Sequence, residues 1–301
     1  MTEPRYERIP LSTGVTLNVA LAGPADGEPI LFLHGFPESH RTWRNQIADL
    51  SADYRIVAPD QRGFGGSDKP EGVDDYATGR IVEDALALMD ALGIDHFTLA
   101  GHDWGGAVAW AAAMRHPFRI KRLIIVNAPH PVVFQRTVIE DEAQREASQY
   151  IRWFRSPLAE IGIKAMGYEA LLEKVLLSHS DPTKLPDEER QHYLDDWQRP
   201  GALTAMLNWY RAAGVEVPAM GEDAKVPLAA RAPLPKLRTP TLVVWGMKDP
   251  ALLPIQVEGM ADYVENLRVV TSDTAGHFIT WEEPGTVTRA IRGFLEETSS
   301  A

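Results

Sequence analysis

The chain contains no cysteine, so disulfide bonds, thiolate metal ligands and cysteine nucleophiles are all excluded. It also lacks any apolar run close to the ~18 residues of a membrane-spanning helix, and its first residues lack the apolar core of an export signal. Basic residues are outnumbered, and the formal net charge of −12 argues against binding to nucleic acid or to an anionic membrane. We therefore expect a cytoplasmic protein, monomer or homodimer, that acts on a small molecule.

Short apolar runs alternate along the chain with longer segments of helical periodicity. The runs cover residues 29–34, 54–59, 96–101, 120–127, 241–246 and 266–272. Such runs are typical of buried parallel strands, and helical periodicity covers residues 79–93, 105–116 and 283–297. The alternation predicts an α/β protein with a mostly parallel sheet flanked by helices. Two further short strands, near residues 6–11 and 15–20, would add an antiparallel edge.

The alternation stops in the middle of the chain. Between roughly 131 and 235, tryptophan, tyrosine and acidic or amide residues occur at helical spacing, without β-branched runs. We interpret this block as a helical cap inserted over the carboxyl edge of the sheet, where open α/β sheets bind ligands. The predicted division is a first core part at 1–130, a cap at 131–235 and a second core part at 236–301. Proline and alanine are frequent in residues 217–240, which predicts a loop that returns to the sheet.

The sequence GHDWGG, residues 101–106, lies between a predicted strand and a predicted helix. This is the context of a nucleophile elbow, and Asp103 occupies the nucleophile's position. Glycines on either side tolerate the strained backbone of such a turn. A carboxylate is already ionised at pH 7 and can attack a saturated carbon without a base, whereas serine needs one. The alternative is that Asp103 only caps the following helix.

A second motif, HGFP, follows the predicted strand at 29–34. The backbone N–H groups of Phe36 and Trp104, the residue after the nucleophile, are expected to form an oxyanion hole. Pro37 is expected to fix the loop through a cis peptide, because proline tolerates that geometry. The alternative is an ordinary exit from a strand into a loop.

A third motif, AGHF, places His277 after the last predicted strand and before the last helix, where this arrangement presents its base. Asp249 follows the strand at 241–246 and fits the order nucleophile, acid, base. Asp249 could instead be a turn former before Pro250, and the other position for an acid holds Asn127. His34 and His102 are expected to hold backbone in place, and the other six histidines to be surface or core residues.

Neither a cofactor nor a metal is predicted. The glycine-rich stretch at 60–70 resembles a phosphate loop at first sight, but it lacks the G-K-[ST] that would place a lysine on phosphates. We interpret it as a structural turn. Histidine and acidic residues do not cluster at the spacing of zinc ligands.

Together the motifs HGFPES, DQRGFGGSDKP, GHDWGG, KD at 248–249 and AGHF resemble, in order and spacing, the epoxide hydrolases of the α/β-hydrolase fold. The resemblance spans residues 29 to 284 or so. It implies an eight-stranded, mostly parallel sheet with a helical lid, and an epoxide and water as the reactants. It further implies that Asp103 forms an alkyl ester, that water activated by His277 and Asp249 hydrolyses the ester, and that a vicinal diol is released.

Members of that family bind the epoxide oxygen with two lid tyrosines. Tyr210, in LNWYRAAG, matches the second of these, and Tyr150, in SQYIRWFRSP, is similar in context to the first. The resemblance thus implies that both tyrosines are catalytic, although each could instead belong to the core of the cap. The residues expected to contact the substrate are Phe36, Trp104, Tyr150, Trp153 and Tyr210.

Aspartate-nucleophile hydrolases also include haloalkane and fluoroacetate dehalogenases, which remain the alternative. Haloalkane dehalogenases usually have asparagine where this chain has Phe36, and fluoroacetate dehalogenases have arginine where it has Trp104. Arg152 and Trp153 could nevertheless assist a halide. An alternative of another class is a catalytically silent, hydrolase-like binding protein, although such a protein has no need for all five predicted catalytic side chains.

Overall fold

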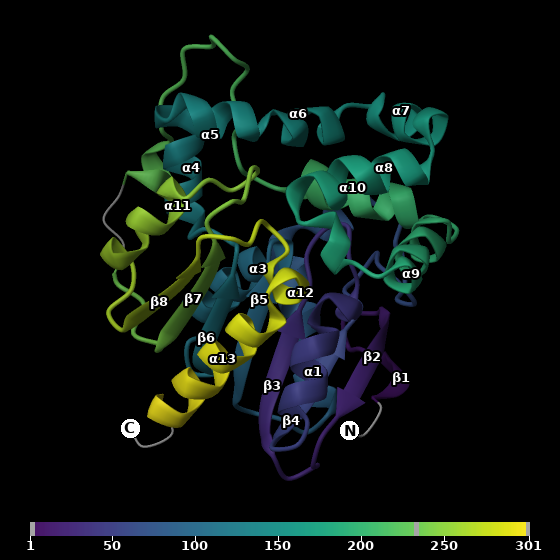
Figure 1. Cartoon of the computed structure of the whole chain (residues 1–301), viewed down its shortest axis with the longest axis vertical. Coiled ribbons are helices and arrows are strands. Elements are labelled where there is room, and N and C mark those ends of the chain that lie inside the picture. The colour runs from purple at the N-terminus through teal and green to yellow at the C-terminus, as the bar shows by residue number, and fades with distance from the viewer. Residues whose placement is uncertain (1–3, 232–234, 299–301) are drawn as a thin grey trace.

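An eight-stranded sheet forms the centre of the protein in a computed structural model, which describes residues 4–231 and 235–298 (Figure 1). In spatial order the strands are β1 (Arg5–Pro10), β2 (Thr16–Ala22), β4 (Tyr54–Pro59), β3 (Glu28–Leu33), β5 (Phe97–His102), β6 (Ile120–Val126), β7 (Thr241–Gly246) and β8 (Leu267–Ser272). Strand β2 pairs antiparallel with β1 and β4, and all other neighbouring strands are parallel. The predicted sheet and its antiparallel edge are therefore confirmed.

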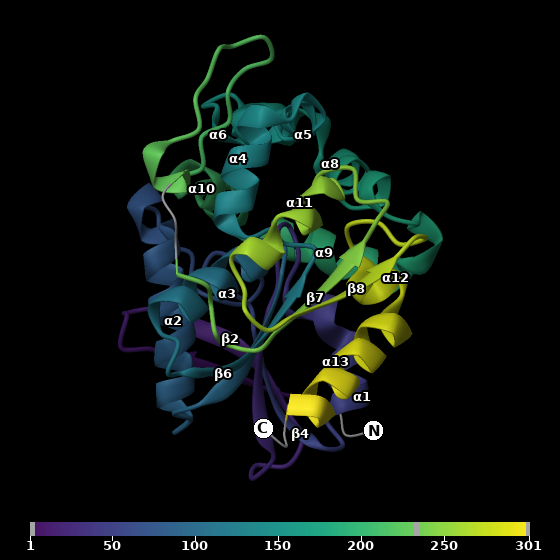
Figure 2. The ribbon, with the colours of Figure 1, turned by 90° about the vertical axis from the view of Figure 1, so that its left-hand side faces the viewer.

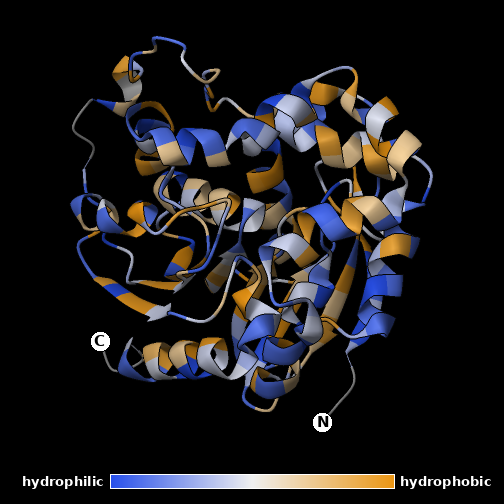
Figure 3. Cartoon of the chain, turned by 45° about the horizontal axis from the view of Figure 1, so that its top comes forward, coloured by the Kyte–Doolittle hydropathy of each residue, from blue (hydrophilic) through white to orange (hydrophobic). Residues whose placement is uncertain are grey.

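Helices cover both faces of the sheet (Figure 2). One face carries α2 (Thr78–Ala91) and α3 (Trp104–Arg115), and the other carries α1 (Arg44–Leu50) and α13 (Pro284–Thr298). Successive residues of a strand point to opposite faces. Leu31 and Leu33 of β3 accordingly pack in the core under α2 and α3, whereas Ile30 and Phe32 pack in the core under α1 and α13. Burial on both faces explains why these strands are continuous apolar runs, which are largely orange in Figure 3.

Between β6 and β7 the chain leaves the sheet and forms a block of helices at the carboxyl ends of the strands (Figure 1). These elements are α4 (Pro131–Glu140), α5 (Glu142–Ala147), α6 (Gln149–Arg155), α7 (Ala159–Met166), α8 (Tyr168–Val175), η3 (Leu177–His179), η4 (Pro182–Lys184), α9 (Asp187–Trp197) and α10 (Ala202–Ala212). The arrangement agrees with the expected cap, whose boundaries stay a prediction.

After α10, the described residues form the short helix η5 (Leu228–Ala230) and otherwise irregular backbone until β7 begins. This agrees with the loop predicted at 217–240, of which residues 232–234 lie outside the described residues. The remaining short elements are η1 (His40–Trp43), η2 (Val73–Tyr76), α11 (Ile255–Glu258), η6 (Met260–Asp262) and α12 (Ile279–Glu282). Across the described ranges, the helices are too short or too polar to span a membrane.

The stretch 60–70 connects the core to the cap, and its polar groups bind within the chain. The Arg62 guanidinium donates to both carboxylate oxygens of Asp84 on α2, at 2.7 Å each. The carbonyl oxygen of Arg62 accepts a hydrogen bond from the indole of Trp209 on α10, at 3.0 Å. These contacts agree with a structural role for the stretch.

Candidate active site

Asp103 lies on the tight turn between β5 and α3, with the positive φ of 51° and a ψ of −121°. The turn requires glycine because backbones approach closely here. A Cβ on Gly105 would lie 2.3 Å from the carbonyl oxygen of Leu33, and a Cβ on Gly101 would lie 2.3 Å from that of Gly105. The side chain of Asp103 makes no capping hydrogen bond to α3, so the helix-cap alternative is wrong.

Two backbone amides converge on the Asp103 carboxylate. The N–H of Phe36 donates to Oδ2 at 2.8 Å, and the N–H of Trp104 is among the groups that lower the pKa of this carboxylate. These are the two amides expected to form the oxyanion hole. The Phe36–Pro37 peptide is cis, as predicted from the sequence.

His277 lies in the loop between β8 and α12, and its two ring nitrogens face two carboxylates. Nδ1 lies 2.6 Å from Oδ2 of Asp249, and Nε2 lies 3.8 Å from Oδ1 of Asp103. Oδ1 of Asp249 accepts hydrogen bonds from the amides of Ala251 and Leu252, at 2.9 Å each. Asp249 therefore shapes its own turn and also contacts the imidazole. The structure agrees with both interpretations of this residue, as a turn former and as the partner of His277.

Asn127 holds Asp249 in place, a role that the sequence did not suggest. It follows β6 with a φ of 40°, at the position considered for an alternative acid. Its Nδ2 donates to Oδ2 of Asp249 at 2.8 Å, and its Oδ1 accepts from the amide of Gly246 at 2.9 Å. The amide side chain thus ties the ends of β6 and β7 to the acid of the site.

Burial and charge set the protonation of the three side chains. Burial raises the pKa of Asp103, and this exceeds the lowering caused by His277, His102 and the two backbone amides. Burial raises the pKa of Asp249 too, but His277 and the hydrogen bonds to the carboxylate outweigh it and the net shift is downward. Burial lowers the pKa of His277, but Asp249 and then Asp103 outweigh it and raise the value to about 9. The imidazole of His277 is therefore protonated at neutral pH, and the carboxylate of Asp249 is charged.

A second buried pair lies behind His277. Nε2 of His102 lies 2.9 Å from the carbonyl oxygen of His277, and Nδ1 lies 3.3 Å from Oε2 of Glu38. Oε1 of Glu38 accepts from the Tyr193 hydroxyl and the Trp281 indole, at 3.0 Å each. His102 thus supports backbone, as expected, whereas the sequence did not single out Glu38.

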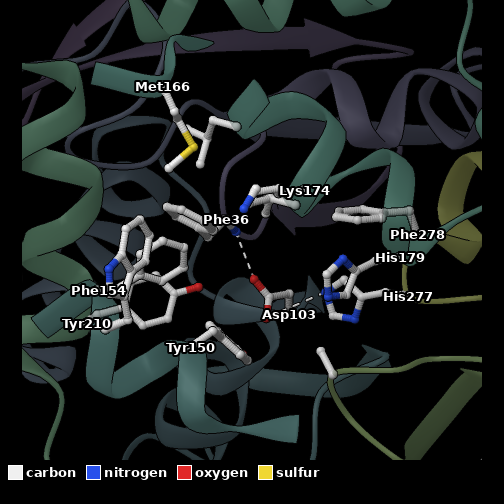
Figure 4. Close-up of a pocket in the computed structure, with 14 residues that line it drawn as sticks. Phe36, Asp103, Tyr150, Phe154, Met166, Lys174, His179, Tyr210, His277 and Phe278 are labelled. Atoms are coloured by element: carbon white, nitrogen blue, oxygen red, sulfur yellow. Dashed lines mark hydrogen bonds and ion pairs between the residues drawn. The ribbon is translucent and has the colours of Figure 1, made fainter. Parts of the chain in front are cut away.

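The two predicted lid tyrosines face Asp103 (Figure 4). Tyr150 comes from α6 and Tyr210 from α10, and their ring centroids lie 6.0 Å apart. Burial is the main cause that raises the pKa of both phenols, and the charge of Asp103 adds to it. Both phenols are therefore neutral hydrogen-bond donors at pH 7.

The structure gathers most of the predicted residues around one cavity of about 240 Å³. Those that line it are Phe36, Asp103, Tyr150, Trp153, Tyr210 and His277. Asp249 lies behind His277 and does not line the cavity. The side chain of Trp104 packs edge-on against Tyr210, and it lines a second cavity that also reaches Asp103. Lys174 and His179 line the first cavity as well, and no sequence motif indicated either of them.

A family model described as alpha/beta hydrolase fold matches residues 28–284 of the chain. The chain belongs to the α/β-hydrolase family. This α/β-hydrolase is 38% identical over 288 residues to the AB hydrolase superfamily protein YfhM of Bacillus subtilis, covering 95% of this chain and 96% of that protein. It is 34% identical over 291 residues to Epoxide hydrolase 3 of Xenopus tropicalis, covering 95% of this chain and 76% of that protein.

A solved structure described among novel epoxide hydrolases from metagenomes of hot environments matches this α/β-hydrolase with a TM-score of 0.91. The two chains are 45% identical, and the match covers 98% of this chain and 99% of the other. The predicted fold class and the resemblance to epoxide hydrolases are therefore confirmed. Within the described part of the chain, no group of three or more histidine and acidic side chains could hold a metal ion.

Proposed function

We propose that this α/β-hydrolase adds water to an epoxide and releases a vicinal diol, through an ester on Asp103. The observation that carries the proposal is the placement of two neutral phenols, Tyr150 and Tyr210, across a cavity from Asp103 and His277. An epoxide oxygen needs such donors because an alkoxide is too basic to leave unaided. Similarity to epoxide hydrolases over nearly the whole chain supports the same reaction.

In the first step a carboxylate oxygen of Asp103 attacks one ring carbon, and the carbon–oxygen bond of that carbon breaks. The ring oxygen takes a proton from one tyrosine while the other donates a hydrogen bond. The products are a hydroxyalkyl ester on Asp103 and a tyrosinate.

Ester formation also prepares His277 for the second step. The charge on Asp103 is one of the causes that hold the pKa of His277 near 9, and the ester removes this charge. The pKa of the imidazole then falls, which favours loss of its proton to solvent, while the tyrosinate takes a proton up. The neutral imidazole can now act as a base.

In the second step His277 takes a proton from water, and the resulting hydroxide attacks the carbonyl carbon of Asp103. The amides of Phe36 and Trp104 stabilise the oxyanion, a contact worth about 3 to 4 kcal/mol per donor in other hydrolases. The intermediate collapses as the bond between the carbonyl carbon and the alkyl oxygen breaks, and His277 returns the proton to that oxygen. The second proton of the water remains on the new carboxyl oxygen and then passes to His277, so that the carboxylate of Asp103 and the imidazolium of His277 are both restored. One oxygen of the regenerated carboxylate therefore comes from water.

Single-turnover hydrolysis in ¹⁸O-labelled water, with enzyme in excess of epoxide, tests this route. We expect the label in the peptide that contains Asp103 and unlabelled diol, because the diol takes its second oxygen from the old carboxylate. Enzyme kept in labelled water without epoxide is the control and should stay unlabelled. Label in the diol and none in the peptide would mean that water attacks the epoxide directly.

Replacing Tyr210 by phenylalanine should lower kcat/KM for epoxides by on the order of 10²-fold, since one donor to the ring oxygen is lost. The ring contacts of Tyr210 with Phe36 and Trp104 do not need the hydroxyl, so the fold should be retained. Tyr263→Phe is a matched control, because Tyr263 stacks on His130 and lines neither cavity at Asp103. Equal kinetics for both variants would exclude Tyr210 as a donor.

The dehalogenase alternative has less support in this site. The side chain at position 36 is a phenyl ring packed against Phe154 and Tyr210, and it offers no N–H to a leaving halide. A halide electrode with haloalkane and haloacetate substrates checks this point. Absence of turnover on both epoxides and halogenated compounds would favour the silent binding protein.

A further inference from the structure

Two separate cavities meet at the nucleophile. The first, called here the α8-side cavity, has a volume of about 240 Å³ and is lined in part by Met166, Leu171 and Val175. The second, called the α3-side cavity, has a volume of about 380 Å³ and is lined in part by Ala111 and Val215. Asp103 and Tyr150 line both cavities, so the reacting centre lies at their junction.

Neighbouring residues divide between the two cavities. On α6, Phe154 lines the α8-side cavity, whereas Ile151 lines the α3-side cavity. In the loop after β7, Ala251 faces the first cavity and Leu252 the second. The cavities therefore extend away from Asp103 in different directions, with Tyr150 between them.

The stereochemistry of ring opening relates the junction of the two cavities to the structure of the substrate. Attack at a ring carbon requires the Asp103 oxygen, the carbon and the departing ring oxygen to lie in line. The proposed reaction places the ring oxygen under Tyr150 and Tyr210. The substituents of the two ring carbons then point sideways, away from each other along the carbon–carbon bond. At a junction of two cavities, each substituent has a cavity of its own.

We infer that the substrate is an internal epoxide, with one apolar arm on each ring carbon and one arm in each cavity. This inference rests on the proposed function and narrows its substrate class. Both cavities are lined largely by apolar side chains, and together they reach the size of pockets that hold drug-sized ligands. A terminal epoxide has one arm and leaves one cavity without apolar contact.

Two isomeric epoxides of equal size can distinguish a site with two arm cavities from a site with one. They are 1,2-epoxyoctane, with one six-carbon arm, and 4,5-epoxyoctane, with two three-carbon arms. A site with a single arm pocket would reject the internal isomer, because its second arm would collide with the wall. In this protein we expect kcat/KM for 4,5-epoxyoctane to lie within a factor of ten of that for 1,2-epoxyoctane, or above it. A larger deficit of the internal isomer would overturn the inference.

Variants that fill one cavity at a time sharpen the test. A Cβ on Gly214 meets no atom within 4 Å, so Gly214→Phe can narrow the α3-side cavity, and Val175→Phe can narrow the α8-side cavity. Ala111→Leu is a second variant of the α3-side cavity if Gly214→Phe does not fold. Leu228→Phe is the control, because Leu228 is 81% exposed and lines neither cavity.

The measured quantity is the ratio of kcat/KM for 4,5-epoxyoctane to that for 1,2-epoxyoctane in each variant. The internal isomer needs both cavities, whereas the single arm of the terminal isomer can move to the open one. Each filling variant should therefore lower the ratio by on the order of tenfold, since about fourfold is lost per methylene that stays in water. An unchanged ratio in folded variants of both cavities would overturn the inference about the internal epoxide and leave the proposed function standing. If the protein hydrolyses neither isomer nor other epoxides, the proposed function fails together with it.

Discussion

His277→Gln is expected to stop the reaction after its first half and to leave the substrate attached to Asp103 as an ester. The attack of Asp103 needs no base, whereas hydrolysis of the ester needs one. Glutamine can occupy the space of the imidazole, but it cannot take a proton from water. We expect kcat to fall by about 10³-fold or more, in the range typical of a lost general base. Intact-protein mass should increase by the mass of one epoxide.

Peptide mapping places the adduct, and two further variants control the result. Asp103→Asn combined with His277→Gln should carry no adduct, because the nucleophile is gone. His96→Gln replaces an exposed histidine that bonds to the carbonyl oxygen of Phe118, far from the cavities, and should behave as wild type. Turnover by His277→Gln within tenfold of wild type, or an adduct on another residue, would contradict the proposed order of steps.

The parts of the site that the sequence predicts are those whose geometry is encoded locally. Gly101 and Gly105 flank Asp103 because backbone segments approach too closely for a Cβ, so the elbow appears as a short motif. Asp249 and His277 lie in the loops that follow β7 and β8, and the carboxyl ends of parallel strands meet at one edge of the sheet. Motif order along the chain therefore translates into proximity.

What the sequence could not predict depends on packing between distant segments. Glu38 lies 3.3 Å from His102 and accepts a hydrogen bond from Trp281, which is 243 residues along the chain. Asn127 supports Asp249 across a separation of 122 residues. Trp104 was predicted to contact the substrate, which stays a prediction, and its side chain lines the α3-side cavity rather than the cavity lined by Phe36 and Tyr210. No local sequence pattern indicates how α6, α8 and α10 pack against one another above the sheet.

Arg62→Met is expected to have the largest effect on stability. Arg62 and Asp84 are 3% and 2% exposed, and the guanidinium donates two hydrogen bonds to the carboxylate. The variant leaves the Asp84 charge buried without its partner, a change that costs about 3 to 5 kcal/mol in other proteins. Thermal unfolding should therefore show a Tm lower by on the order of 10 °C. Arg268→Met is the matched control, because Arg268 pairs with Glu297 at 2.6 Å on the surface, where such pairs contribute about 1 kcal/mol or less.

The double variant Arg62→Met with Asp84→Leu separates the loss of an attraction from the burial of an unpaired charge. If the unpaired charge dominates, removing the carboxylate as well should restore most of the lost stability, although Thr13 and the carbonyl oxygen of Asp75 lose hydrogen bonds. A double variant no more stable than Arg62→Met would mean that the ion pair itself stabilises the fold. Equal Tm values for Arg62→Met and Arg268→Met would instead show that water reaches Asp84 once Arg62 is gone. The carbonyl oxygen of Arg62 accepts from Trp209 of the cap, so if loss of the ion pair displaces the turn at 60–70, activity should fall together with Tm in the single variant.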